Sequence, residues 1–197
     1  MFKPFPPVLV TPPAAPPVSL EEAKAHLRVD HDEENALIEA LIAAATAHLD
    51  GWTGILGRCL VTQTWRQDLR EFPAGGTIRL PFPAPGSVSV TYYDAANAEQ
   101  TLAPSAYHVL DDIRGGAIEL AASASWPAVY DRPDAVSVTF NAGYGAGNAV
   151  PAALKAAIKL MIGDLYMNRE TVAKTGVSVP MSTAAHMLIA SYRRARV

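Results

Sequence analysis

The residue pattern closest to a ligand-binding motif is the glycine-rich run Gly143-Tyr144-Gly145-Ala146-Gly147, between an expected strand and an expected helix. Such loops hold the pyrophosphate of a dinucleotide when the glycines have the spacing GxGxxG and the loop opens a helix within a βαβ unit. Here the spacing is GxGxG, and the next helix begins at Pro151, which has no N–H for a phosphate. The pattern favours a flexible connection, and a small nucleotide-binding enzyme stays as an alternative.

The side chains that could act as nucleophiles, bases or metal ligands are scattered along the chain. The five histidines form no HxxxH or HExxH pair, and Cys59 has no adjacent histidine or asparagine motif. His31, between Asp30 and Asp32, could contact a metal, but a solvated cluster at a helix start is the favoured interpretation. Neither GxSxG nor a phosphate-binding loop ending in Gly-Lys-Ser/Thr occurs. We therefore expect no catalytic residues, no cofactor and no metal site.

Composition indicates a globular chain without a nucleic-acid or membrane signature. The sequence has 197 residues, of which 50% are hydrophobic and 18% charged. Its formal charge is −3, from 16 Lys+Arg and 19 Asp+Glu, so the chain lacks the basic excess with which sequence-specific DNA-binding proteins hold phosphates. No apolar stretch is long enough to cross a bilayer, and a single cysteine cannot form an internal disulfide.

The elements that must position any site are helical at both ends of the chain. Ser19-Leu20-Glu21-Glu22 is a capping box, and the acidic run 30–34 marks a second helix start. Apolar residues then recur with a period of 3.6. We expect four helices, at about 19–28, 33–51, 151–168 and 184–192.

Between the second and third helices the period changes to two, which indicates strands. The run 107–110, then Gly115-Gly116, then 117–120 predicts a hairpin. The strands are short and joined by Pro/Gly turns, so we predict an α+β fold: a small bundle of about four helices with one small antiparallel sheet inserted between the second and third helices. The expected regions are an arm at 1–18, a helical core at 19–58 and 148–170, an inserted sheet lobe at 59–142 and a C-terminal segment at 171–197.

The N-terminal arm is rich in proline, which makes up seven of the first seventeen residues. Proline lacks a backbone N–H, so the arm cannot build a helix or a central strand. We expect it to be extended. A disordered tail without a partner is the alternative.

The helical blocks resemble one family. They are Val18–Asp30, Glu33–Ala45, Leu49–Gly54, Val150–Ile158, Tyr166–Glu170 and Leu188–Arg193. Together they resemble the head-to-tail connector (adaptor) proteins of tailed phages. The resemblance is most specific at the helices and weak over the strands.

This resemblance implies a structural role. Connectors of this kind form a ring of about twelve copies beneath the portal vertex, extend the DNA channel without sequence-specific binding, and present a platform to the next tail-completion (stopper) protein. The expected location is the neck of a phage or of a phage-derived gene transfer agent, assembled in the bacterial cytoplasm. The alternative within the same class is a tail-completion or stopper ring protein.

Two sets of residues are candidates for assembly contacts. Ring contacts are assigned to small side chains of the second helix, which permit close approach of a neighbouring helix: Ala40, Ala43, Ala44 and Ala47. Portal docking is assigned to apolar and basic residues near the C-terminus: Met187, Leu188, Ile189, Tyr192, Arg193, Arg194 and Arg196. For both sets, packing within the same chain is the alternative. Contact with DNA is a second alternative for the arginines.

Overall fold

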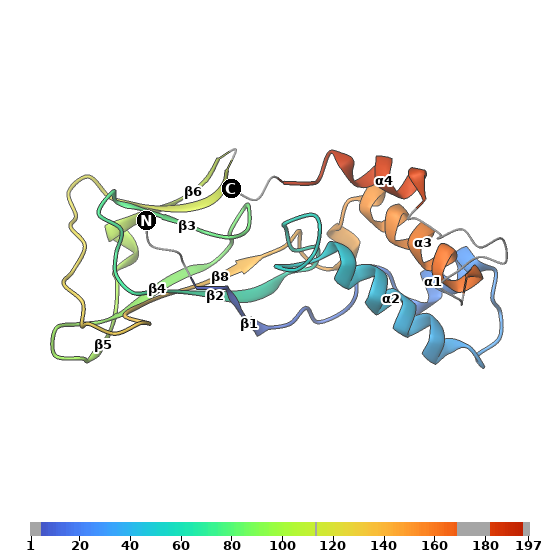
Figure 1. Cartoon of the computed structure of the whole chain (residues 1–197), viewed down its shortest axis with the longest axis horizontal. Helices are drawn as coiled ribbons and strands as arrows, with labels where there is room; N and C mark the ends of the chain where they lie inside the picture. The colour runs from blue at the N-terminus through green and yellow to red at the C-terminus, as the bar shows by residue number, and fades with distance from the viewer. Residues whose placement is uncertain (1–4, 113, 169–181, 195–197) are drawn as a thin grey trace. The chain divides into compact units, whose positions relative to one another are not determined.

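The computed structural model describes residues 5–112, 114–168 and 182–194. Within these residues the chain forms two compact units, each made of more than one stretch. We call the first, residues 5–13, 62–112 and 114–143, the β unit, and the second, residues 14–61, 144–168 and 182–194, the helical unit. Figure 1 shows the elements of each unit. Within the described residues the chain therefore passes from one unit to the other three times.

The helical unit contains the four predicted helices. They are α1 (Leu20–Leu27), α2 (Asn35–Leu49), α3 (Ala152–Met167) and α4 (Thr183–Ala190). The predicted capping box is present, because the Glu22 N–H donates to Ser19 Oγ and the Ser19 N–H donates to the Glu22 carboxylate. Two short 3₁₀ turns also occur, η1 (Pro104–Ala106) in the β unit and η2 (Gly147–Ala149) before α3.

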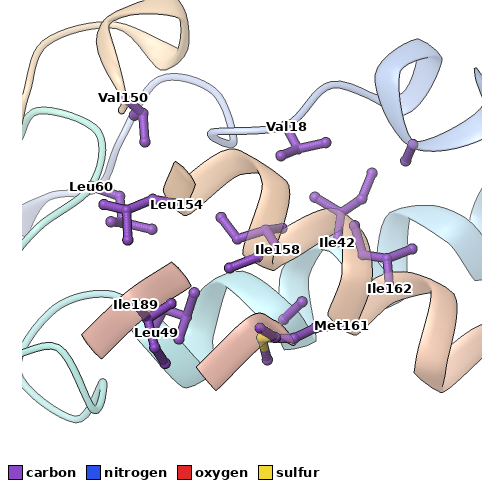
Figure 2. Packing of buried hydrophobic residues seen from close by; sticks show 14 of the residues in the cluster. Val18, Ile42, Leu49, Leu60, Val150, Leu154, Ile158, Met161, Ile162 and Ile189 are labelled. Carbon is purple, nitrogen blue, oxygen red and sulfur yellow. The ribbon is translucent and has the colours of Figure 1, made fainter. Parts of the chain in front are cut away.

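The core of the helical unit is a single aliphatic cluster to which all four helices contribute (Figure 2). Ile38, Ile42 and Leu49 from α2 meet Leu154 and Ile158 from α3, and the exposed fraction of each is 3% or less. With Ala45, which is also buried, the positions on α2 recur three or four residues apart, as the sequence pattern predicts for the buried face of a helix. Burial of this face holds the helices together.

The β unit contains two antiparallel sheets. The five-stranded sheet has the order β1-β2-β8-β4-β5 and the three-stranded sheet the order β3-β7-β6. The strands are β1 (Val8–Thr11), β2 (Gln63–Leu69), β3 (Thr77–Arg79), β4 (Val88–Tyr93), β5 (Glu99–Thr101), β6 (Tyr107–Asp112), β7 (Gly115–Leu120) and β8 (Val136–Ala142). The predicted hairpin is confirmed as β6 and β7, paired in the register Leu110 to Ala117.

This arrangement differs from the predicted one in two ways. The strands form two sheets rather than one, and β1 comes from the proline-rich arm, before the helices. Alternating hydrophobicity shows where strands occur but not which strands pair, because pairing depends on contacts far apart in the sequence. Within the arm, Val8–Thr11 is extended and forms a strand at the sheet edge, where proline is tolerated, whereas residues 1–4 lie outside the described residues.

The buried interior of the β unit combines aliphatic side chains with clustered aromatic rings. The ring centroid of Phe82 lies 5.0 Å from that of Trp65 and 6.4 Å from that of Phe140. A second cluster stacks Phe72 on Trp126, with centroids 4.6 Å apart. Aromatic pairs at these separations contribute more than their buried area alone.

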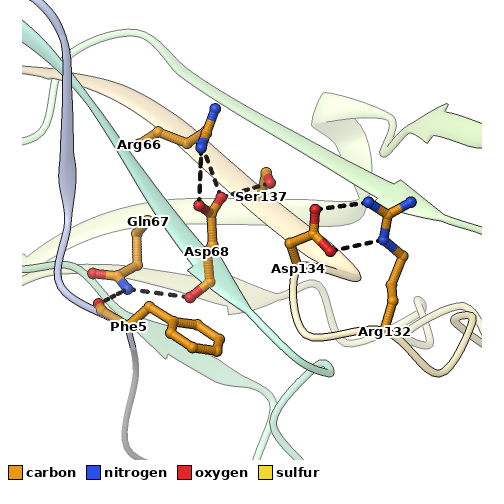
Figure 3. Close-up of polar contacts among 7 residues, drawn as sticks. All are labelled: Phe5, Arg66, Gln67, Asp68, Arg132, Asp134 and Ser137. Carbon is orange, nitrogen blue, oxygen red and sulfur yellow. Dashed lines mark hydrogen bonds and ion pairs between the residues drawn. The ribbon is translucent and has the colours of Figure 1, made fainter.

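Polar contacts join strands of the β unit and attach the arm (Figure 3). The buried Gln67 side chain on β2 donates to the Phe5 carbonyl at 2.6 Å. Asp68, also on β2, accepts from the Ser137 hydroxyl of β8 and forms an ion pair with Arg66 at 2.9 Å. Arg132 makes a two-pronged contact with Asp134. The amide of Gln67 therefore holds the chain that enters β1.

Candidate docking surfaces

Helix α2 has two distinct faces. Its inner face packs in the helical core, whereas Ala40, Ala43, Ala44 and Ala47 are all exposed. These four positions lie within about 100° of one another around the helix, because consecutive residues are offset by about 100°. The face is apolar, flat and unable to form ion pairs. It can accept a close-packed second helix.

The C-terminal candidates divide between core and surface. Ile189 is fully buried in the helical core, and Leu188 and Tyr192 are half-buried against it. Met187 lies on the outer side of α4, with an exposed fraction of 74%, and Arg193 is also exposed. The structure thus brings these residues onto one short helix and its end. Arg196 and residues 171–181 lie outside the described residues.

Arg58 fixes the end of α4, a role that sequence reasoning missed. Its Nε donates to the Tyr192 carbonyl at 2.9 Å, and its guanidinium donates to the Tyr144 hydroxyl at 2.6 Å. The Arg194 N–H donates to the Leu56 carbonyl at 3.1 Å. No local pattern could reveal these contacts, because Arg58 and Tyr192 are 134 residues apart in sequence.

The acidic connection between α1 and α2 is held by local contacts. Asp32 accepts from the Lys24 ammonium at 2.7 Å and from the Asn35 amide, and both bonds keep the pKa of Asp32 below its ordinary value. His31 contacts Glu33 at 2.9 Å. No group of three or more potential metal ligands gathers within residues 5–112, 114–168 and 182–194. The connection has the geometry of a solvated helix start.

The glycine-rich run serves as a packed connection from β8 to α3. Gly145 has φ of 125°, a conformation that favours glycine. A Cβ on Gly147 would lie 2.9 Å from the Pro16 carbonyl oxygen, so only glycine permits this approach. The Tyr144 N–H donates to the Leu60 carbonyl at 3.0 Å. In the parts of the chain that the structure describes, no helix has the length and apolar character of a membrane span.

Two comparisons with known proteins bear on these surfaces, and a third, with curated protein sequences, finds no match. The first is with protein-family models. Residues 17–78 match the phage gp6-like head-tail connector protein family. This match spans α1, α2, β2 and the start of β3, and it confirms the family resemblance over the three blocks that lie between Val18 and Gly54.

The fold is also shared with chains from gene transfer agent particles. A chain in the neck of an empty particle, computed with C6 symmetry, has a TM-score of 0.78 and 24% sequence identity; the match covers 97% of this chain and 96% of that one. A chain in the native virion has a TM-score of 0.76 and 24% sequence identity, with the same coverage of both chains. A chain in the neck of the native particle, computed with C12 symmetry, has a TM-score of 0.69 and 23% sequence identity; the match covers 96% of this chain and 97% of that one. The matched family is named for head-tail connectors and the matched chains come from a particle neck or virion, which agrees with the predicted structural role.

Proposed function

We propose that this chain is a head-to-tail connector (adaptor) subunit in the neck of a phage-like particle, either a phage or a gene transfer agent. One observation carries the proposal: the fold matches a neck chain over nearly the whole length of both proteins, including the β unit that the family match barely reaches. In this role the subunits form a ring, bridge the capsid to the tail and line the channel through which DNA passes.

The direct test is to delete the gene from cells that make the particles. We expect DNA-filled heads without attached tails in electron micrographs, together with loss of gene transfer or infectivity. Supplying the intact chain in trans should restore tails. Particles that keep their tails after the deletion would contradict the proposal, as would turnover of a small substrate by the purified chain.

The exposed alanine face of α2 is the proposed helix contact between neighbouring subunits. A ring of about twelve copies needs a heterologous contact, in which one face of each subunit meets a different face of the next. Replacing Ala43 with Trp should block close approach and reduce incorporation into particles. The matched control is Ala25→Trp, at an exposed alanine of α1 outside the proposed contact. Equal incorporation of the two variants would exclude the α2 face.

The C-terminal end is the proposed contact with the portal. Met187 and Arg193 are exposed in the folded subunit and are available without rearrangement, whereas Ile189 could dock only if α4 left its own core. The variant Met187→Asp should weaken portal binding, and His186→Ala, an exposed neighbour, should not. Undiminished portal binding by Met187→Asp would refute docking through the packed α4.

The arginines allow DNA contact as a second proposal for the same end, because their cationic side chains match phosphates. Replacing Arg193, Arg194 and Arg196 with Ala separates the two. Loss of head-to-tail joining with normal DNA retention supports portal docking. The reverse result supports contact with DNA in the channel.

A further inference from the structure

Two edge strands of the β unit, β1 and β6, carry apolar side chains that are exposed to solvent. β1 pairs only with β2, and β6 only with β7, among the described residues. Every residue of β1 is exposed, and Val8, Leu9 and Val10 have exposed fractions of 43–51%. On β6, Val109 and Leu110 are 41% and 42% exposed. Unpaired apolar edges of this kind join other strands unless they are covered.

We compare two kinds of contact between copies of the chain: β1 with β6, and either strand with the same strand of another copy. The two strands lie on opposite sides of the β unit (Figure 1), so one subunit cannot join them. The other two edge strands are less suited to such a contact: β5 has three residues, Glu99, Gln100 and Thr101, which are all polar, and in β3 the apolar side chain, Ile78, is buried. A contact between different edges of two copies is heterologous, which is the type that closes into rings.

We propose that β1 of one subunit pairs with β6 of the next subunit around the ring. The inference rests on the proposed ring function and specifies how its β units join. The pairing is antiparallel, with Leu9 opposite Leu110 and Val8 opposite Asp111. It places apolar side chains together and satisfies the free backbone groups of both edges.

The side chains next to the two edges support this direction. Leu9 is the register partner of Trp65, so both point to the same face of the sheet, and Leu110 would cover Leu9 there. Val8 is the register partner of Arg66, whose side chain is 45% exposed. Asp111, exposed on β6, would then lie in the same row as this guanidinium. A parallel pairing would move Asp111 away from Arg66.

Disulfide trapping in assembled particles tests the pairing. Opposite residues of paired strands have Cα atoms about 4.5–5.5 Å apart, within the range that a disulfide spans. Cys59, the chain's own cysteine, is buried, so introduced thiols are the reactive ones. Cells should produce Leu9→Cys and Leu110→Cys chains together, and purified particles should be run on non-reducing gels.

The expected result is a dimer that contains one chain of each kind, and a ladder of higher oligomers from chains that carry both substitutions. Either variant alone should give no dimer. The matched control, Leu9→Cys with Thr101→Cys, places the second thiol on β5 and should also give none. A dimer from Leu9→Cys alone would mean that two β1 strands pair symmetrically, and it would overturn the proposal.

The result also separates this inference from the proposed function. If the variants enter particles but neither this pair nor a second pair, Val8→Cys with Asp111→Cys, forms a dimer, the strand contact is refuted and the connector role is not. If the unaltered chain is absent from particles, the connector role fails and the inference fails with it. Leu9 and Leu110 are both more than 40% exposed, so their replacement should leave the fold intact, as circular dichroism can verify.

Discussion

The helical unit and the β unit expose different kinds of surface. The helical unit buries its large aliphatic side chains in one cluster and presents small or isolated apolar groups, such as the alanines of α2 and Met187. The β unit includes clustered aromatic rings in its interior and exposes the backbone edges of β1 and β6 to solvent. A neighbouring subunit can therefore contact the helical unit by helix packing and the β unit by strand pairing. The first kind of contact depends on side-chain size, and the second on free hydrogen-bonding groups.

The largest expected effect of a single substitution is among the clustered aromatic rings of the β unit. Phe140 lies on β8, within the five-stranded sheet, and is fully buried against Phe82. Phe140→Ala should lower the free energy of unfolding by about 3–5 kcal/mol, because it removes buried area and leaves a cavity. Denaturant unfolding measures this change. Tyr130→Ala, at a side chain that is 44% exposed, is the control and should cost far less. Similar losses for both variants would mean that the aromatic contacts do not dominate this unit.

A slightly smaller loss is expected in the aliphatic cluster. Ile158 on α3 is fully buried, whereas Leu165 on the same helix is 42% exposed. Ile158→Ala should cost about 2–5 kcal/mol of unfolding free energy, and Leu165→Ala should cost much less, since most of its surface stays in water. If the two variants unfold at the same denaturant concentration, α3 does not use the face that the structure buries.

The N-cap of α1 should contribute less to the free energy of unfolding than a buried side chain in the core of either unit. Ser19→Ala removes the acceptor of the Glu22 N–H and should cost about 1 kcal/mol in the thermal or denaturant unfolding of the chain. Ser19→Thr keeps a side-chain oxygen and should recover most of this loss. A fully stable Ser19→Ala variant would show that burial of α1 alone holds its start.

The helical unit was easier to predict than the β unit, for a physical reason. A helix is specified by neighbours three or four residues apart, so the pattern Ile38, Ile42, Leu49 and the Ser19 capping box were visible in the sequence. A sheet is specified by distant pairs, such as Gln63 with Ala142, which leave no local signal beyond alternation. The same difference applies to the candidate surfaces. The exposure of the α2 alanines could be predicted from helix geometry. The hydrogen bond from Arg58 to the Tyr192 carbonyl and the pairing of β1 with β2 could be found only in the structure, because both join residues that are far apart in sequence.

The smallest expected effect is electrostatic and depends on pH. The Lys155 ammonium on α3 donates to the Glu22 carboxylate on α1 at 2.6 Å, and this bond holds the pKa of Glu22 below its ordinary value of 4.5. A carboxyl whose pKa is lowered by folding stabilises the folded state above its unfolded pKa, and this contribution is lost as pH falls through the folded value. Because the Glu22 side chain is 39% exposed, solvent screens the pair, and we expect roughly 0.5 kcal/mol at neutral pH.

The variant Lys155→Met should therefore be less stable than the unaltered chain at neutral pH, and the difference should shrink as pH falls below 4.5. Unfolding free energies measured across this range for both chains provide the test. Lys155→Arg, which keeps the charge, should retain most of the contribution. A difference that stays constant down to acid pH would assign the loss to packing of the lysine stem rather than to the charge. In that case the Lys155 side chain would stabilise the contact between α1 and α3 through its apolar stem, as the other residues of the helical core do, and its charge would contribute nothing measurable to the stability of this unit.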